Sequence, residues 1–538
     1  MRITFDESGI REAFCTCPYD WGGWCKHIVA VLLACARQPE QIEVRQPVDA
    51  LLADLDGDQM RTLLLRLIEY RPELTDILEA EVQSLKARSV ESAPQKTRQR
   101  KTSVDASAFR RRVRAILHSL DHMRASEAYW QVSSVVDQVR QVLDQAWEFI
   151  EAGDGENALR ILEALTEEYV EGWTMLDDSD GDASSLFYDL GPAWTEALLT
   201  TDLTPEERRE WADRLSAWQA EIDDYGVDDV FAPAQAAALQ GWDFPPLLRV
   251  LKGEITPLGA WDDEAPWYAD ELAEARLNVL ERQKRYQEYL YLAEAEGQME
   301  HYLTMLARLG RVQQAVAEGM KYLATPNAAL ALAKALHAQG AIEEALRIAK
   351  HGLGLEGQKS PLARWLRDAA QSAGQTEQAL EAALVAFRED TTLDDYKKIQ
   401  ELTGDRWPEV RADLLEHLRH SRSHYPAPRI EIFLHEGLID DAIAAVGNST
   451  SYTLVEPVVD AAIESRPDWA IRAAQRQAEE IMDAGASDRY HHAVRWLEKA
   501  RAAYRAAGRE AEWRAYLENL LQRHARKYKL VPMLKALR

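Results

Sequence analysis

The stretch LALAKALHAQGAIEEALRIAKH, residues 330–351, indicates the fold of most of this chain. It contains Gly340, followed after four residues by Ala345 inside a second helical segment. Glycine permits a tight turn between antiparallel helices. The small alanine lets the two helices approach closely. The stretch therefore predicts one helical hairpin.

The same signature recurs along the chain, at Gly153/Ala158, Gly310/Ala315, Gly340/Ala345, Gly374/Ala379 and Gly437/Ala442. The glycines at 310, 340, 374, 404 and 437 are 30, 34, 30 and 33 residues apart, and Gly404 and Gly508 mark comparable turns without the alanine. Such periods are typical of stacked helix–turn–helix units, and a single unit cannot bury its apolar face alone. Residues 303–322 and 330–351 resemble tetratricopeptide (TPR) repeats in architecture, although most aromatic positions of that family are missing. We expect a TPR-like α-solenoid whose extended surface binds protein partners.

A different kind of signal lies at the start of the chain, where Cys15-x-Cys17 is followed by Cys25-x-His27. Three thiolates and one imidazole suit a closed, tetrahedral, structural Zn²⁺ site. The residues before Cys15 read as a small hairpin turning at Ser8-Gly9, and those from Lys26 read as a buried helix. We expect Cys25 just before that helix and His27 in its first turn.

These residues, together with Pro18 and the run Lys26-His-Ile-Val-Ala30, resemble a SWIM zinc finger, a ββα module. The resemblance implies one structural Zn²⁺ held by Cys15, Cys17, Cys25 and His27. It covers about 35 of 538 residues, and this chain begins inside the first strand of the family pattern. The family is found beside Snf-type remodelling ATPases and in Mutator-type transposases. It is thought to bind DNA or protein partners, and the resemblance does not choose between the two.

Other interpretations of the cysteines are inert buried thiols, a disulfide, or catalytic zinc with an open position. Four ligands at these spacings favour structural zinc over all three. Cys35 is expected to be a small buried side chain, with a fifth-ligand or redox role as the alternative.

Net charge is 63 − 90 = −27, which weighs against general nucleic-acid binding. Residues 86–114 are the exception, with ten basic and two acidic side chains. Most of this segment reads as a solvated linker. The alternative is a nucleic-acid or acidic-partner contact, and the candidate residues are Lys26, Lys96, Arg98, Arg100, Lys101, Arg110, Arg111 and Arg112.

Residues 170–265 are acidic and rich in tryptophan, with helix joints marked by Pro205, Pro233 and Pro245. Aromatic side chains at helical spacing predict core packing; a ligand groove is the alternative. Asp178, Asp180 and Asp182 are similar to part of a calcium loop, but that pattern breaks at Ala183, so an acidic surface loop is expected. No nucleotide-binding loop, nucleophile elbow or zinc-protease motif occurs, which predicts no enzymatic activity and no small-molecule substrate.

The chain shows no secretory h-region, and its longest apolar run near the start, residues 28–36, is too short to cross a bilayer. Sparse cysteines suit a reducing compartment, so we expect a cytoplasmic protein, or a nuclear one in a eukaryote.

The expected fold is mainly α, with a small ββα zinc finger before the solenoid. The predicted segments are a SWIM-type finger (1–40), a helical extension (41–88), a basic linker (89–109), an acidic Trp-rich helical region (110–275) and the TPR-like solenoid (276–538). The predicted function is a zinc-binding, non-enzymatic adaptor that docks protein partners, with DNA-associated complexes as one setting that the resemblance implies. Direct nucleic-acid binding through the finger and residues 86–114 is the alternative, and a catalytic domain within residues 170–300 is a third, weaker one.

Overall fold

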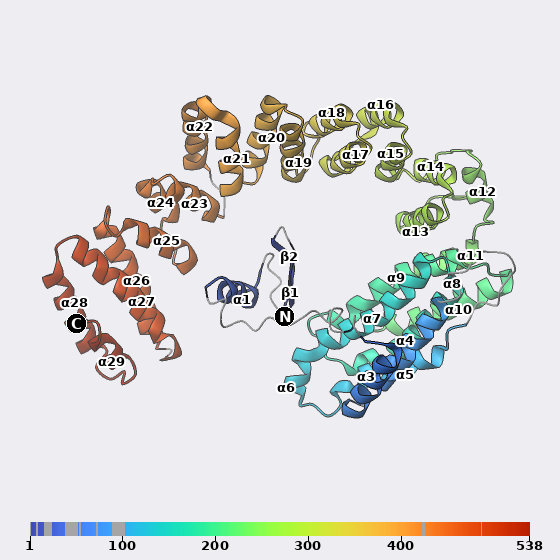
Figure 1. Cartoon of the computed structure of the whole chain (residues 1–538), viewed down its shortest axis with the longest axis horizontal. Coiled ribbons are helices and arrows are strands. Elements are labelled where there is room, and N and C mark those ends of the chain that lie inside the picture. The colour runs from blue at the N-terminus through green and yellow to red at the C-terminus, as the bar shows by residue number, and fades with distance from the viewer. Residues whose placement is uncertain are drawn as a thin grey trace. The chain divides into compact units, whose positions relative to one another are not determined.

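The computed structural model describes residues 2–6, 9–15, 24–37, 52, 55–71, 74–88, 103–421, 425–485 and 487–538. Two compact units divide the chain between residues 298 and 299 (Figure 1). Apart from one hairpin, the regular elements of the described residues are helices. This confirms the mainly α prediction. The predicted segment limits within each unit remain predictions.

The chain begins with the predicted ββα module. Strand β1 (Arg2–Asp6) pairs antiparallel with β2 (Gly9–Phe14), and the register shifts between Thr4 and Phe5. Helix α1 (Lys26–Arg37) follows, and Ile28 in its first turn is buried. The hairpin and the helix together place the three described metal-ligand candidates.

The remainder of the first unit is a helical body. Its helices are α3 (Gly57–Tyr70), α4 (Leu74–Arg88), α5 (Ala106–Leu117), α6 (Ala125–Ala128), α7 (Val132–Glu151), α8 (Gly155–Gly172), α9 (Asp182–Thr200), α10 (Pro205–Asp223), α11 (Ala232–Gln240), α12 (Pro245–Leu251), α13 (Ala269–Arg282) and α14 (Tyr286–Ala295). Helices α5, α7, α8, α9 and α11 share one continuous apolar core. Helix α10 begins with Pro205 and is capped by Thr204 and Glu207, which bond each other's backbone N–H groups.

Tryptophan side chains form much of this core, as predicted. Trp194 is fully buried in α9, and its indole N–H donates to Thr166 Oγ1 at 2.9 Å. The rings of Trp211 and Trp218 pack against it, with centroids 5.2 Å and 5.5 Å away. Since Trp173 and Trp261 are buried as well, these residues are packing elements rather than the lining of an open groove.

The second unit is an array of helical hairpins. Its helices are α15 (Met299–Arg308), α16 (Val312–Tyr322), α17 (Pro326–Ala338), α18 (Ile342–Gly352), α19 (Ser360–Ser372), α20 (Thr376–Glu389), α21 (Leu393–Thr403), α22 (Trp407–His420), α23 (Ala427–His435), α24 (Ile439–Val446), α25 (Tyr452–Ala462), α26 (Pro467–Ala484), α27 (Tyr490–Ala506), α28 (Glu510–Arg523) and α29 (Leu530–Lys535). Most helices pack against the next helix along the chain, and several also pack against the helix two places along, as α15 does on α17 and α17 on α19. Figure 1 shows successive hairpins such as α17–α18 and α19–α20 side by side. This packing confirms the predicted helical-repeat solenoid, while its predicted start at residue 276 remains a prediction.

The recurrent glycine–alanine signature has a direct structural cause. Gly340 ends its turn with φ of 78°, a left-handed conformation that favours glycine. Ala345 is fully buried five residues later, where the second helix meets its partner. A closer approach occurs at Gly352, where a Cβ atom would lie 2.4 Å from the Cβ of Ala329. Small residues therefore set the spacing of the hairpins.

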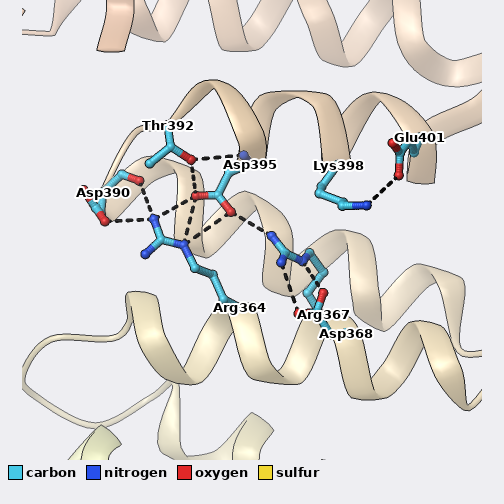
Figure 2. A network of polar contacts seen from close by, with 8 residues as sticks. All are labelled: Arg364, Arg367, Asp368, Asp390, Thr392, Asp395, Lys398 and Glu401. Carbon is cyan, nitrogen blue, oxygen red and sulfur yellow. Dashed lines mark hydrogen bonds and ion pairs between the residues drawn. The ribbon is translucent and has the colours of Figure 1, made fainter. Parts of the chain in front are cut away.

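One joint of the array contains a buried ion network (Figure 2). Asp395 of α21 accepts hydrogen bonds from Arg364 Nη2 at 2.8 Å and from Arg367 Nη1 at 2.7 Å, both from α19. Its side chain also accepts a bond from the Thr392 hydroxyl, and Thr392 caps the start of α21. Asp395 is 1% exposed. The network thus links two helices that are two places apart in the array.

None of the described helices has both the length and the apolar composition that a membrane crossing requires.

Candidate metal centre

Three of the four predicted zinc ligands converge at one end of the finger. Cys15 immediately follows β2, Cys25 immediately precedes α1, and His27 is the second residue of α1. The two sulfur atoms and a ring nitrogen all lie within 4.8 Å of one another. Cys15 is half-buried, Cys25 is buried and His27 is exposed. Among the described residues, this is the single cluster of three or more Cys, His, Asp or Glu side chains close enough to share a metal ion.

The spacing of these donors fits a zinc ion. Cys15 Sγ lies 3.8 Å from His27 Nδ1. In a tetrahedral site with Zn–S near 2.3 Å and Zn–N near 2.0 Å, the corresponding edge is about 3.5 Å. The three side chains therefore need little movement to hold one Zn²⁺. When bound, the ion supplies a cross-link between hairpin and helix.

The start of α1 supports the thiolate form of Cys25. The backbone N–H of Ile28 points to Cys25 Sγ at 3.5 Å. Unpaired N–H groups and the positive end of the helix dipole stabilise negative charge at this position. The local sequence thus contributes to metal binding through its backbone as well as through its side chains.

Cys17, the fourth predicted ligand, lies outside the described residues, and its role remains a prediction. The side chain of Cys35 in α1 also lies outside them. A donor set of two thiolates and one imidazole leaves one tetrahedral position, which the predicted Cys17 thiolate would complete.

The basic residues predicted to contact nucleic acid or an acidic partner lie outside the described residues, are exposed or pair with carboxylates. Lys96, Arg98, Arg100 and Lys101 lie outside the described residues, and Lys26 is exposed. Arg110 pairs with Glu167 of α8, and Arg111 pairs with Glu79 of α4. These pairs hold α5 against its neighbours in the helical body.

Arg112 was predicted as a surface contact, and the structure corrects this. The residue is 5% exposed, and its guanidinium lies 3.5 Å from Glu81. Burial lowers the pKa of Arg112, and the nearby Glu81 carboxylate acts against that shift. A side chain in this position cannot reach a phosphate backbone without rearrangement of α5.

The acidic loop before α9 is a structural turn. Asp178 Oδ1 accepts the backbone N–H groups of Ala183 at 2.6 Å and Ser184 at 3.2 Å. Asp180 accepts the Tyr129 hydroxyl at 2.6 Å, which raises the pKa of that tyrosine. These carboxylates therefore cap and brace α9, in agreement with the predicted surface loop.

Comparisons with known proteins give a specific match at the amino terminus of the chain. Residues 2–36 match the family model of the SWIM zinc finger. A 73-residue segment is 34% identical to the "Zinc finger SWIM domain-containing protein 8 homolog" of Drosophila melanogaster, covering 14% of this chain and 3% of the fly protein.

A solved "Circular tandem repeat protein with novel repeat topology and enhanced subunit contact surfaces" aligns over 86% of this chain and 96% of its own, at 15% identity and a TM-score of 0.19. That score does not show a shared fold. The repeat architecture therefore rests on the helix packing described above. The ligand geometry and the family match lead to the same conclusion for the amino terminus: residues 2–36 of this chain carry a SWIM zinc finger, and its cofactor is Zn²⁺.

Proposed function

We propose that this protein is a non-enzymatic adaptor of the cytoplasm, or of the nucleus in a eukaryote, whose zinc-stabilised finger and helical array dock protein partners. The finger is too small to be stable without its metal, because in such modules the free energy of ligation is also the free energy of folding. Zinc therefore provides a rigid platform rather than a reaction centre.

The exposed surface of the finger carries this proposal. Trp24 is 50% exposed, and Leu33 on α1 is 44% exposed. Val29 lies four residues before Leu33 on the same helix face and is also exposed. Aromatic and aliphatic side chains of this kind are typical of the centre of a protein–protein interface. We therefore expect the finger to meet its partner through α1.

Charge argues against nucleic acid as the ligand of the finger. Residues 2–36 contain three basic and four acidic side chains, a formal charge of −1. Binding to phosphate backbones depends mainly on lysine and arginine. In the neighbouring body, Arg114 joins the pairs described above, because its guanidinium bonds Glu168 at 2.7 and 2.8 Å. The basic side chains described in α5 thus already have carboxylate partners.

Affinity capture from extracts of the protein's own host tests the proposal. We expect partner proteins that survive nuclease treatment and are lost when Leu33 is replaced by glutamate. Leu258→Glu is the matched control, since Leu258 is 49% exposed and lies far from the finger in sequence. Both variants add the same charge to an exposed leucine.

A second measurement distinguishes the docking of protein partners from the binding of nucleic acid. Fluorescence anisotropy should show no binding of double-stranded DNA by the full chain at about 0.15 M ionic strength. DNA binding with a steep salt dependence, together with capture that disappears on nuclease treatment, would establish the nucleic-acid alternative instead.

A further inference from the structure

A cavity of about 510 Å³ opens between α25, α26 and α27 in the array. The two long helices α26 and α27 have 18 and 17 residues, whereas α25 has 11. Thr450 and Tyr452, at the start of α25, line the cavity together with residues from the far end of α26 and the start of α27. The shorter helix leaves part of the α26–α27 hairpin uncovered, and this difference in length creates the space.

The lining combines an apolar surface with polar side chains. Ile481 and Ala484 of α26 and the buried Trp496 of α27 provide the apolar part. Tyr452 of α25 also lines the cavity and is 64% exposed. Binding sites for compact ligands typically have this volume and this mixture of apolar walls with a few polar groups. The cavity is large enough for one bulky side chain and its neighbours.

The arginines of the cavity, Arg489 and Arg495, lie at and shortly after the start of α27. Arg489 makes no hydrogen bond or ion pair with any described residue through its side chain, and it is exposed. His492 lies one turn further along the same side. Arg489 is therefore available to a ligand, whereas most arginines of this unit are paired.

The carboxylates of the cavity are partly neutralised. Glu456 lies 3.4 Å from Arg495 and 3.2 Å from Lys499. Glu480 is the remaining acidic side chain of the lining. The start of α25 adds positive potential, because the Ser451 side chain makes no capping bond to the first turn and pairs instead with Thr453 Oγ1 at 2.8 Å. Uncapped N–H groups at a helix start favour an anion.

The surrounding sequence strengthens this preference. Residues 451–538, which include all three helices that line the cavity, contain 16 basic and 12 acidic side chains, a net charge of +4, in a chain whose total is −27. Within them, residues 489–538 carry a net charge of +9. A local field of this sign attracts acidic segments and orients them before contact. The cavity thus lies at the border of the most basic stretch of the array.

From these observations we infer that the cavity binds an acidic peptide segment of a partner protein. A large apolar side chain of the peptide enters between Tyr452 and Trp496, and an adjacent carboxylate meets Arg489. This inference rests on the proposed adaptor function and specifies the chemistry of one docking site within it.

Fluorescence anisotropy with the full-length protein tests the inference. The probe is a labelled eight-residue peptide in which aspartate and glutamate flank a single phenylalanine. We expect saturable binding that weakens at least tenfold in Arg489→Glu and in Ala484→Trp, which fills the cavity without changing its charge. Arg526→Glu is the matched control, since Arg526 is exposed and makes no hydrogen bond or ion pair with the described part of the chain; its affinity should match that of the wild type. Circular dichroism of each variant verifies folding.

Four results would overturn the inference: no binding of the acidic peptide, equal binding of a peptide with lysines in place of the acids, unchanged affinity in either cavity variant, or binding of DNA at the same site. A short DNA duplex that binds and depends on Arg489 would assign the site to nucleic acid. Nuclease-resistant capture through Leu33 is measured independently. A failed peptide experiment therefore leaves the adaptor proposal standing, and a failed capture experiment is recognised separately from it.

Discussion

Replacement of Asp395 by asparagine tests whether one joint of the array depends on a buried charge. The carboxylate accepts hydrogen bonds from Arg364, Arg367 and Thr392, and the surrounding protein excludes water from it. Asparagine has nearly the same shape and keeps one acceptor oxygen. The substitution therefore removes the charge with little change in packing.

The expected cost follows from the partners that remain. Removing one member of a buried ion pair destabilises a protein by about 3–5 kcal/mol. Asp368 still contacts Arg367, and Asp390 still contacts Arg364, whose side chain is 32% exposed. We therefore expect the lower value, about 3 kcal/mol. Arginine stays protonated in proteins, so loss of a proton from Arg364 cannot relieve the imbalance.

Native-state hydrogen exchange measured by mass spectrometry reports this change locally. A cost of about 3 kcal/mol should accelerate exchange of amides in α19 and α21 about 100-fold, at about 1.4 kcal/mol per factor of ten. Lys398→Ala is the control on the same helix. It removes an exposed pair with Glu401 at 3.0 Å, and such pairs contribute about 0.2–0.5 kcal/mol. Exchange in Asp395→Asn within about twofold of the wild type would refute the reasoning.

Three further changes have distinct expected outcomes. Cys25→Ser should release the bound zinc and unfold the finger while the helical ellipticity of the body persists, whereas Cys35→Ser should retain the metal; elemental analysis and circular dichroism report both, and full zinc occupancy in Cys25→Ser would contradict the ligand assignment. Burial of the ring and the nearby Lys527 lower the pKa of His524, so the unfolded chain binds a proton more readily. The urea midpoint of unfolding should therefore fall as the pH drops below the unfolded value of 6.5, and this decrease should be absent in His524→Gln. Gly352→Ala places a methyl group against Ala329 and should lower the free energy of unfolding of the array by about 1–3 kcal/mol, seen as a lower thermal midpoint. An unchanged midpoint would contradict the close packing of α17 against α18 at this position.

The turns of the array were predictable because their cause is local. A left-handed residue after a helix favours glycine whatever surrounds it, and the glycines at 310, 340, 374 and 437 all adopt φ between 70° and 78°. The finger was predictable for a similar reason, since metal chemistry restricts both the residue types and their spacing. Each of these sequence patterns spans no more than a few tens of residues.

The burial of Arg112 could not be predicted from local sequence patterns alone. In the sequence this residue belongs to a run of three arginines, and a basic run is usually solvated. Its position three residues after Phe109 and one before Val113, both fully buried, places it beside the core stripe of α5. The helical period therefore contained a signal for burial, but the partner Glu81 lies 31 residues away and depends on how α4 packs. The same limitation applies to Asp395, whose arginine partners precede it by 28 and 31 residues.

The hairpins of residues 299–538 make mostly neighbour-to-neighbour contacts, which has a consequence for how this protein can change over evolutionary time. Duplication or deletion of one 30–34-residue unit would lengthen or shorten the platform, and each new seam would reuse an existing alanine-lined surface. The seam that joins α19 to α21 is different. A unit inserted there would separate two arginines from the aspartate that neutralises them, so this position should resist recombination that other seams tolerate.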